Sequence, residues 1–376
     1  MANTLHLSRD VKVYILWGTK YWEVPVLDGF SFSQATNTTE VTLKEFATTA
    51  NVSRRGRKVF NDSLGPAEWS FSTYARPTVQ GNFHRAPEEI LWAMMVGAAT
   101  AGYDHTGDSG SGEWDHQAGA GLDSDGTSLD INFLDSNKLV FPDAEIFFVF
   151  PANDAGGSEA DIAYKLDKAT VNECTMDFDI DGITTLNWSG MAQSLTEVTA
   201  PTVSTPEINS TSLTKTTTFI RNRLTTLVLG ANTDVSQPGL LTSYSLVLTG
   251  GSLTITNNVE HITPSSLGVV NKPLGHTMGT RSVTGSFTCY LDNSTTASAE
   301  LFDDLLGATT NVKNEFSLTF NVGGTTAPCV AFTCAHAMLE IPTHSVEDVV
   351  SMEVNFHALP EDIADKDDLA IVYKGV

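Results

Sequence analysis

The two halves of this 376-residue chain carry the same order of sequence patterns. In each half, a short run that alternates polar and apolar residues precedes a helix-like run, and an aromatic-rich run that begins with an acid comes after it. Two copies of one order of elements indicate a duplicated unit, so we expect the chain to fold as two versions of one architecture. The repeated segments are 69–74, 87–97 and 145–150 in the first half and 285–290, 299–307 and 315–320 in the second.

The match extends to both sides of these segments. Upstream, 29–37 is similar to 251–257, and downstream, 181–188 is similar in pattern to 347–354. The spacing between the copies is 216 residues at positions 69 and 285, but 170 residues at positions 145 and 315. The first copy therefore contains an extra stretch, which we place at residues 100–141.

Two stretches set the predicted domain boundaries. The insertion 100–141 is rich in Gly, Asp and Ser, which predicts a long exposed loop. Residues 196–212 contain two prolines and many Ser and Thr residues, which is typical of a linker. We therefore predict a first domain over 1–195 with its inserted loop, a linker, and a second domain over 213–376.

The chain is predicted to be mostly β. Thr, Ser, Val and Phe recur in short alternating runs, which is the period of half-buried strands. Segments 87–97 and 299–307 instead carry apolar residues at helical spacing, acids in the first turn and Gly at the end. We expect two tandem β-sandwich or tube domains, each with one flanking helix. The predicted strands include Lys12–Leu16, Phe30–Ser33, Trp69–Tyr74, Ile146–Phe150, Phe178–Ile180, Tyr244–Leu248, Phe316–Phe320 and Ser351–Phe356.

The charge balance excludes one class of function. With 21 basic and 45 acidic residues the formal charge is −24, which disfavours high-affinity nucleic-acid binding, because that affinity comes mainly from neutralised phosphates. No apolar run approaches the ~18 residues of a membrane-spanning helix, and the first residues lack the apolar core of a secretory signal. We expect a soluble protein that is made in a cytoplasm and has no membrane partner.

The four cysteines form no CxxC pair and lie in apolar surroundings. We predict that they are small buried residues of a reduced compartment, and not disulfides or zinc ligands. They are Cys174, Cys289, Cys329 and Cys334.

No motif predicts an enzyme. Residues 107–110 (Gly-Asp-Ser-Gly) are similar to the nucleophile segment of chymotrypsin-type proteases, but only 106 residues precede them and no histidine base has a recognisable setting. The chain also lacks a P-loop, a GxGxxG motif and HExxH. We predict no catalytic residue.

Two groups of residues suggest a metal, and both have a simpler interpretation. Asp177, Asp179 and Asp181 begin like a calcium-binding EF-hand loop, but Trp188 stands where the bidentate Glu should be. The same segment fits a strand that ends in an Asp-Gly hairpin turn, which we favour. The pairs 104–105 and 115–116 (Asp-His) lack the spacing that would bring them together. We predict no metal and no cofactor.

Segment 53–58 holds four of the 21 basic residues, Arg54, Arg55, Arg57 and Lys58. It could be a phosphate-binding patch, a solvated loop, or a basic loop that contacts an acidic face of another copy of the chain. We favour the third interpretation on this acidic background.

The segments that match between the halves also resemble a known family. Segment 30–37 with the polar loop after it, the helix 88–97, the hairpin 166–189 and the second set within 244–358 resemble the major tail tube proteins of long-tailed bacteriophages. The duplication is similar to the T5-like type of this family. The order of elements is also similar to that of the tube proteins of type VI secretion systems and contractile tails.

The resemblance implies a structural virion protein of the phage tail, assembled in the host cytoplasm. Six tube domains would form a ring, so three chains would close one ring, and stacked rings would form the hollow tube that conducts double-stranded DNA. The implied partners are further copies of the chain and other tail proteins: the terminator, the tape measure and the baseplate or tip.

Strand geometry is compatible with this ring. If each domain contributes four strands, about 24 strands at ~4.8 Å spacing and ~40° tilt give a backbone diameter of roughly 50 Å. Side chains narrow this to about 40 Å, which admits a duplex roughly 20 Å across. Closing the ring would also pair sheet edges that would otherwise be open.

Two sets of site residues follow as hypotheses. Arg54, Arg55, Arg57 and Lys58, in the predicted loop 38–61, would form the contact between rings. The matching segment 259–279 has only Lys272, so we expect the two copies to contribute unequally. Asp177, Asp179 and Asp181 would line the lumen, where negative charge repels phosphates and lets DNA slide.

The alternative is a tandem β-sandwich that binds carbohydrate or acts as an adhesive surface protein. It would remain monomeric and expose aromatic side chains along a groove. Its support is Trp114 in the insertion, together with Trp22 and Trp69 if these are exposed.

Overall fold

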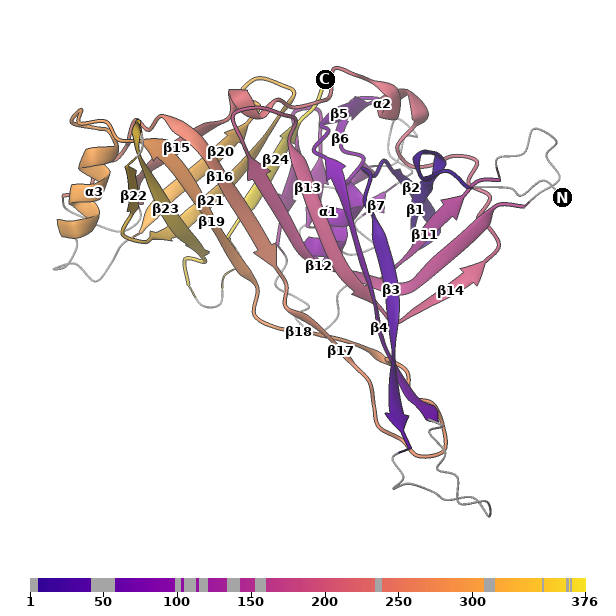
Figure 1. Cartoon of the computed structure of the whole chain (residues 1–376). Helices are drawn as coiled ribbons and strands as arrows, with labels where there is room; N and C mark the ends of the chain where they lie inside the picture. Colours follow the sequence, from indigo (N-terminus) through magenta and orange to yellow (C-terminus); the bar gives the residue numbers. More distant parts are fainter. Residues whose placement is uncertain are drawn as a thin grey trace, which may run out of the picture.

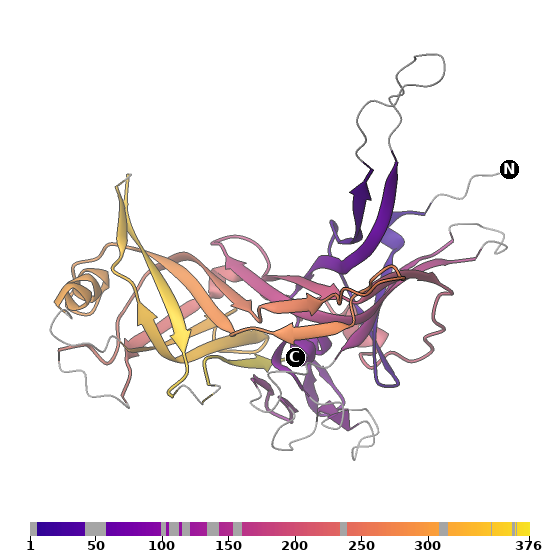
Figure 2. The same cartoon turned by 90° about the horizontal axis from the view of Figure 1, so that it is seen from below.

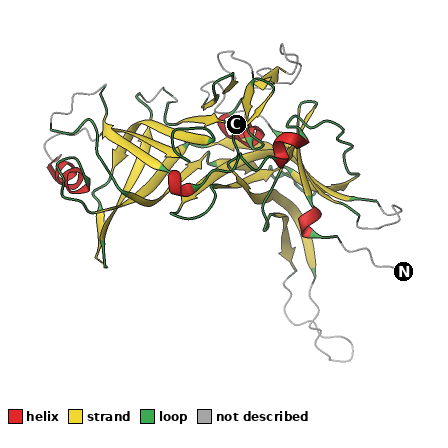
Figure 3. Cartoon of the chain, turned by 90° about the horizontal axis from the view of Figure 1, so that it is seen from above, coloured by secondary structure: helices red, strands yellow, loops and turns green. Residues whose placement is uncertain are grey.

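The computed structural model describes residues 6–41, 58–98, 103–104, 113–114, 121–133, 143–152, 160–233, 239–307, 315–346, 348–362, 365 and 367–376. The chain is mostly β, as predicted, and its helices are few and short (Figure 1, Figure 3).

The first half contains most of the long strands. Its elements are a 3-10 helix (Ser8–Asp10), β1 (Lys12–Trp17), β2 (Lys20–Val24), β3 (Ser31–Glu40), β4 (Val59–Tyr74), β5 (Thr78–Gln80), β6 (Phe83–Arg85), α1 (Glu89–Val96), β7 (Tyr103–Asp104), β8 (Glu113–Trp114), β9 (Leu122–Ser124), β10 (Leu129–Asn132), β11 (Ala144–Phe150), β12 (Ile162–Phe178), β13 (Thr185–Ala192) and β14 (Ser194–Val198).

The second half follows with a similar order. Its elements are α2 (Ser210–Thr214), a 3-10 helix (Asn222–Leu224), β15 (Thr226–Ala231), β16 (Leu248–Thr256), β17 (Val259–Ile262), β18 (Gly275–Met278), β19 (Ser282–Tyr290), α3 (Ser298–Gly307), β20 (Phe316–Val322), β21 (Cys329–Leu339), β22 (Thr343–Val346), β23 (Val350–Leu359) and β24 (Ala370–Lys374).

The two halves repeat one strand topology. In the first half, β1, β11, β12, β13, β4 and β3 pair in this order, and every pair is antiparallel. In the second half, β15, β20, β21, β23, β19 and β16 pair in the same way. The repeated sequence patterns therefore correspond to repeated strand pairings. The boundaries at residues 195 and 213 stay a prediction.

Two strand pairings join the halves, β10 with β24 and, within the main sheet, β12 with β16. The last part of β12 pairs with β16, from Glu173 opposite Thr256 to Phe178 opposite Gly251. One sheet therefore runs through both halves in the order β3, β4, β13, β12, β16, β19, β23, β22, which we call the eight-strand sheet. Its end strands, β3 and β22, have no second paired strand among the described residues.

The hydrophobic core lies behind this sheet and is shared by both halves. All eight residues of α1 are buried, and the helix packs against β12 and β10. Trp92 of α1 lies 4.8 Å from the Trp188 ring and donates a hydrogen bond from Nε1 to Tyr373 Oη at 2.8 Å. The helix predicted over 87–97 is therefore the central core element of the first half.

The insertion is not the exposed loop that its composition predicts. Strand β10 pairs with β9 on one side and with β24, near the C-terminus, on the other. Leu129 and Ile131 of β10 and Trp114 of β8 are buried. Short apolar stretches between the Gly- and Asp-rich parts explain this difference, because they supply a cover for α1. The remainder of 100–141 lies outside the described residues.

The predicted linker 196–212 is packed against the first half. Strand β14 overlaps its first residues and pairs with β12. Further on, the Glu207 carboxylate accepts a hydrogen bond from Tyr103 Oη at 2.5 Å and lies 3.4 Å from Lys20 Nζ. The segment is therefore held by specific side chains and does not have the character of a free spacer.

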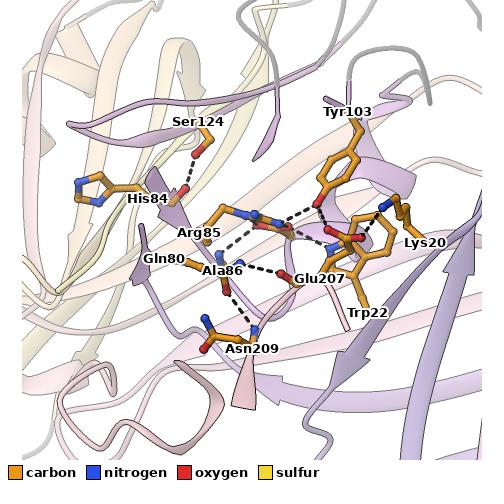
Figure 4. Close-up of polar contacts among 11 residues, drawn as sticks. Lys20, Trp22, Gln80, His84, Arg85, Ala86, Tyr103, Ser124, Glu207 and Asn209 are labelled. Atoms are coloured by element: carbon orange, nitrogen blue, oxygen red, sulfur yellow. Dashed lines mark hydrogen bonds and ion pairs between the residues drawn. The ribbon is translucent and has the colours of Figure 1, made fainter. Parts of the chain in front are cut away.

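Figure 4 shows the polar cluster around this contact. The buried Arg85 guanidinium donates to both carboxylate oxygens of Glu89, with Nε to Oε2 at 2.8 Å, and Trp22 Nε1 donates to Glu89 Oε1 at 3.0 Å. Burial lowers the pKa of Arg85, but the charge and hydrogen bonds of Glu89 raise it by more, so the guanidinium stays charged. Together with Tyr103, this pair ties β2, β6, α1 and the insertion into one unit.

Two predicted strands are wrong in part. The strand predicted over Phe178–Ile180 ends at Phe178, where a hairpin turn with Gly182 at φ +114° leads into β13. This confirms the hairpin interpretation of 177–182. Of the strand predicted over Tyr244–Leu248, only Leu248 belongs to a strand, β16, while Tyr244 forms an isolated bridge to Leu229 and its hydroxyl donates to Asp304 of α3 at 2.6 Å.

The four cysteines are buried, as predicted, and none is paired in a disulfide in the part of the chain that the structure describes. Burial raises the pKa of the Cys334 thiol to about 12 and that of Cys289 to about 11, so neither is a reactive thiolate at neutral pH.

Candidate assembly surfaces

The eight-strand sheet has one apolar and one polar face. Successive residues of a strand point to opposite faces, and the apolar ones, such as Trp69 and Phe287, are buried against the core. The other face, which we call the polar face, carries hydroxyls, amides and carboxylates. Besides Tyr74, Met191 and Tyr290, it holds the polar residues Ser31, Ser33, Glu68, Ser70, Ser72, Glu173, Thr175, Asp177, Thr185, Asn187, Ser189, Ser252, Thr254, Thr256, Thr284, Ser286, Thr288, Thr343, Ser345, Ser351, Glu353, Asn355 and His357.

The charge of the polar face is negative. None of its residues is Lys or Arg, and it includes the carboxylates of Glu68, Glu173, Asp177 and Glu353. Beside it, Glu340 accepts a hydrogen bond from Asn355 at 2.9 Å and contacts His357, and these hydrogen bonds lower the pKa of Glu340. A phosphate backbone facing this surface would meet hydroxyls and negative charge but no strong cation.

Two shallow hollows on the polar face occupy matching positions in the two halves. Every residue that lines the first hollow has a counterpart in the second, and the difference in residue number is constant within each strand. The first hollow is lined by Ser31, Ser33, Glu68, Trp69, Ser70, Asn172, Ser189, Gly190 and Met191, and the second by Ser252, Thr254, Thr284, Gly285, Ser286, Glu340, Asn355, Phe356 and His357. The duplication is thus visible at the level of individual surface positions.

One cross-strand pair in these hollows exchanges its large and small members. In the first half, Trp69 of β4 lies opposite Gly190 of β13. In the second half, the matching positions hold Gly285 of β19 and Phe356 of β23. A Cβ atom on Gly190 would lie 2.5 Å from the Trp69 ring, and one on Gly285 would lie 2.6 Å from the Phe356 ring. Each pair therefore combines one aromatic ring with one glycine, but the ring comes from β4 in the first half and from β23, the counterpart of β13, in the second.

The three predicted lumen carboxylates lie close together but not on one face. Asp177, Asp179 and Asp181 are all exposed. Only Asp177 belongs to the polar face, whereas the other two lie in the turn between β12 and β13. Asp181 lies 3.7 Å from Arg223 in an exposed ion pair. An acidic face was predicted from one segment, but its carboxylates also come from β4 and β23.

A projecting arm forms the second surface. We define the arm as residues 36–41 and 58–64 of the β3–β4 hairpin together with the hairpin of β17 and β18, residues 259–278. The two hairpins descend together in Figure 1, whereas in Figure 2 β3 and β4 turn away from the sheet and β17 and β18 run along it. Leu64 N donates to Asn271 O at 2.8 Å, and Asn271 N donates to Asp62 O at 3.2 Å.

The arm differs from the loop predicted over 38–61. Strand pairing continues to Glu40 and resumes at Val59, so both ends of that segment are β. Of the four basic residues, Arg54, Arg55 and Arg57 lie outside the described residues. Lys58 is exposed, and its Nζ lies 5.1 Å from the centre of the Phe60 ring.

The arm also carries apolar side chains that the charge pattern did not predict. Leu267 is fully exposed, and Phe60 and Leu274 are half or more exposed. Exposed apolar side chains concentrated on one projection indicate a surface that another protein covers. The exposed apolar residues of the arm are Val41, Val59, Phe60, Ile262, Leu267, Val269, Val270 and Leu274.

One described group could hold a cation. The ligand atoms of His336, Glu361 and Asp367 lie within 4.8 Å of one another. His336 is buried and its Nδ1 lies 2.7 Å from Asn232 Nδ2, whereas both carboxylates are exposed. We assign no metal to this group. The Asp-His pairs at 104–105 and 115–116 and the segment 107–110 have side chains outside the described residues.

Comparison with known proteins identifies the family of the chain that carries these surfaces. A family model of the phage tail tube protein matches residues 27–358. The chain belongs to the phage tail tube protein family. It is also 28% identical over 374 residues to the tail tube protein pb6 of Escherichia phage T5, covering 96% of this chain and 74% of that protein. The resemblance in the sequence patterns is thereby confirmed.

As a tail tube protein, the chain is a component of the virion. Within the described ranges, no helix has the length and apolar character to cross a membrane. The adhesive alternative depended on exposed tryptophans, but Trp22, Trp69 and Trp114 are all buried in the tube protein. They are core residues, and Trp69 also forms part of the floor of the first hollow.

Sequence patterns missed three features of this tube protein: the join between β12 and β16, the breadth of the polar face, and the apolar arm. Period-two alternation marks each strand's polar side but not which strands become neighbours. The apolar arm had a visible signal, the run Leu267 to Val270, which was masked by the Pro and Gly residues around it.

Proposed function

We propose that three copies of this chain close into a ring whose eight-strand sheets form one barrel, and that stacked rings form a tube that conducts double-stranded DNA. The observation that carries the proposal is the eight-strand sheet, with one polar face that contains no Lys or Arg and two end strands that, among the described residues, have no second paired strand. The role is structural and not catalytic.

The strand count supports a ring of three chains. Three chains of eight strands supply 24 strands, which at ~4.8 Å spacing and ~40° tilt give a backbone diameter of roughly 50 Å. A bore of about 40 Å between side chains admits a duplex roughly 20 Å across. Two chains would give a backbone diameter near 30 Å, which side chains would narrow to about the width of DNA.

We propose that the polar face lines the bore. Its carboxylates, including Asp177, and those of Asp179 and Asp181 near the mouth would repel phosphates, so DNA would pass without binding. The opposite face cannot line the bore, because it is filled by the core and by α1.

We propose that the arm joins successive rings. Its apolar residues supply area to bury, and the basic residues Arg54, Arg55, Arg57 and Lys58 supply a charge that complements the acidic body of the next ring. The two hairpins contribute unequally, since Lys272 is the lone Lys or Arg of the second. The ends of the tube would contact the terminator and the baseplate or tip, and the tape measure would occupy the bore.

Electron microscopy of the purified protein tests the proposal. Hollow tubes with three chains per ring and a bore wider than 20 Å are expected. Isolated particles at concentrations where tail tubes form, or a bore closed to a duplex, would contradict it.

Charge reversal tests the arm separately. Replacing Arg54, Arg55, Arg57 and Lys58 by Glu should leave rings or single subunits that do not stack. The matched control is Lys272→Glu, which changes one charge on the second hairpin and should weaken stacking far less. Tubes of normal length from the fourfold variant would refute the role of these residues.

A further inference from the structure

The strands at the two ends of the eight-strand sheet are counterparts of the strands at its middle. β3 pairs with β4 as β16 pairs with β19. β22 pairs with β23 as the last part of β12 pairs with β13. One edge strand of the sheet, β3, is therefore the counterpart of β16, and the other, β22, is the counterpart of the last part of β12. These two counterparts, β16 and β12, pair with each other where the halves join.

The register of the internal join can be transferred residue by residue. Ser31 lies opposite Ser70 and Ser252 lies opposite Ser286, so Ser31 and Ser252 are equivalent positions. In the same way, Asp177 lies opposite Thr185 and Ser345 lies opposite Ser351, which makes Asp177 and Ser345 equivalent. Inside the chain, Asp177 lies opposite Ser252.

We propose that β3 of one copy pairs antiparallel with β22 of the next copy, in the register of the internal join between β16 and β12. Ser31 then lies opposite Ser345, Phe32 opposite His344 and Ser33 opposite Thr343. This inference rests on the proposed ring and specifies the contact that closes it.

The apolar side of this edge is incomplete in the single chain. Phe178, at the internal join, is 3% exposed, whereas its counterpart Val346 is 80% exposed. Phe178 lies opposite Gly251, and a Cβ there would be 2.5 Å from its ring. At the outer edge the large residue lies on the other strand. The position equivalent to Phe178 holds the smaller Val346, and the position equivalent to Gly251 holds Phe30. Phe30 of the next copy would therefore cover Val346.

Helix α3 lies next to β22 at the end of the sheet, whereas α1 lies behind the middle of the sheet and packs on β12 (Figure 1). The Phe302 ring of α3 contacts His344 of β22 edge to face, with centroids 4.7 Å apart. Phe32 of the incoming strand would therefore meet an aromatic and apolar surface. Phe32 and Phe302 are only partly buried in the single chain.

The edges also lack the residues that usually prevent pairing. Edge strands of monomeric proteins are commonly blocked by Lys, Pro or inward-pointing charge. Neither residues 31–34 nor residues 343–346 contain Lys, Arg, Asp, Glu or Pro. A slip by one residue would turn Phe32 to the polar face, so burial excludes registers shifted by an odd number of residues.

Disulfide trapping in assembled tubes tests the register. The double variant Ser33→Cys with Thr343→Cys, oxidised with diamide, should give covalent dimers and trimers on a denaturing gel and no larger species. The matched internal control is Thr175→Cys with Thr254→Cys, which joins the equivalent positions within one chain and should give no intermolecular product. Each single variant controls for the four native thiols.

The slipped pair Ser33→Cys with Ser345→Cys should not react, because diagonal positions lie about 7–8 Å apart. Normal tubes that give no product from Ser33→Cys with Thr343→Cys, or product from the slipped pair, overturn the register while the ring stands. Wild-type protein that forms no rings overturns the proposed function itself. Where the double variant does not assemble, cryo-EM of the unmodified tube decides: Phe32 beside His344 supports the register, and any other neighbour contradicts it.

Discussion

Helices α1 and α3 occupy matching positions in the two halves but have opposite surroundings. Ile90, Ala93 and Met94 of α1 are buried, while the matching positions of α3 hold Glu300, Asp303 and Asp304. The first half contains the insertion, whose strand β10 packs on α1, whereas no described strand of the second half makes comparable contact with α3. The strand topology is the same in both halves, but the side chains on the outer face of each helix are apolar where another strand covers the helix and acidic where the helix faces solvent.

The two helix starts are held in the same place by different chemistry. In the first half, Arg76 N donates to the buried carboxylate of Glu88 at 2.9 Å. In the second half, Asp292 N donates to Ser298 Oγ at 2.7 Å. Arg76 is equivalent to Asp292, and Glu88 is equivalent to Ser298. Both halves therefore keep a hydrogen bond from a backbone N–H to the side chain at the helix start, but only in the first half is that side chain titratable.

The largest expected difference between the halves comes from exchanging the residue types at one matching position of the two helices, Ala93 of α1 and Asp303 of α3. Ala93→Asp should lower the free energy of unfolding by about 3–5 kcal/mol, since it buries a carboxylate without a partner. The matched change Asp303→Ala, at an exposed position, should alter it by no more than about 0.5 kcal/mol. Urea denaturation measures both, and equal losses would break the assignment of α1 to the core.

The exchanged glycines should be equally intolerant. Gly190→Ala and Gly285→Ala should each cost about 2–3 kcal/mol, because the new Cβ would lie within 2.2 Å of a backbone oxygen, that of Thr170 or that of Ser252. Gly275→Ala, where nothing lies within 4 Å, is the control and should be close to neutral. A tolerated change at one of the two sites would show that the halves do not pack alike.

The buried Glu88 should give the first half a pH dependence that the matching residue Ser298 does not give the second. Burial raises the pKa of Glu88 to about 7 from an ordinary 4.5. Between pH 4.5 and 7 the folded chain therefore holds a proton that the unfolded chain releases, and the free energy of unfolding falls as the pH rises, by on the order of 2 kcal/mol. Glu88→Gln removes this titrating group, so the free energy of unfolding of the variant should fall less between pH 4.5 and 7 than that of the wild type. Identical slopes in both proteins would contradict the cause.

The smallest effect is expected at the matching contact of the second half. Ser298→Ala removes the acceptor for Asp292 N and the donor to Tyr290 O, and should cost about 1 kcal/mol. Its cost should be the same at pH 5 and pH 8, since no titratable group is lost there. Thermal unfolding at the two pH values checks this.

Part of this fold could be predicted from the sequence because its signals are local. The alternation in 69–74 and 285–290 and the helical spacing in 87–97 depend only on neighbouring residues. The pairing of β12 with β16 depends on which edge is open in three dimensions, and no pattern within either strand encodes that. The insertion was predicted as a loop because Gly and Asp dominate its composition, although a few residues such as Trp114 and Ile131 decide its packing.

The candidate surfaces follow the same rule. The carboxylates at 177–181 and the basic residues at 54–58 were visible as clusters in the sequence. The polar face was not, because its Ser and Thr residues come from eight strands and are unremarkable one by one. The exposed apolar residues of the arm, such as Leu267, could be recognised only after the structure placed them outside the core.

A cryo-EM reconstruction of the assembled wild-type protein tests the central claim most directly. The account predicts three chains and 24 strands per ring, with Ser70, Asp177 and Ser286 facing a bore of about 40 Å. A ring of another size, or one with these side chains on the outer wall, would contradict it.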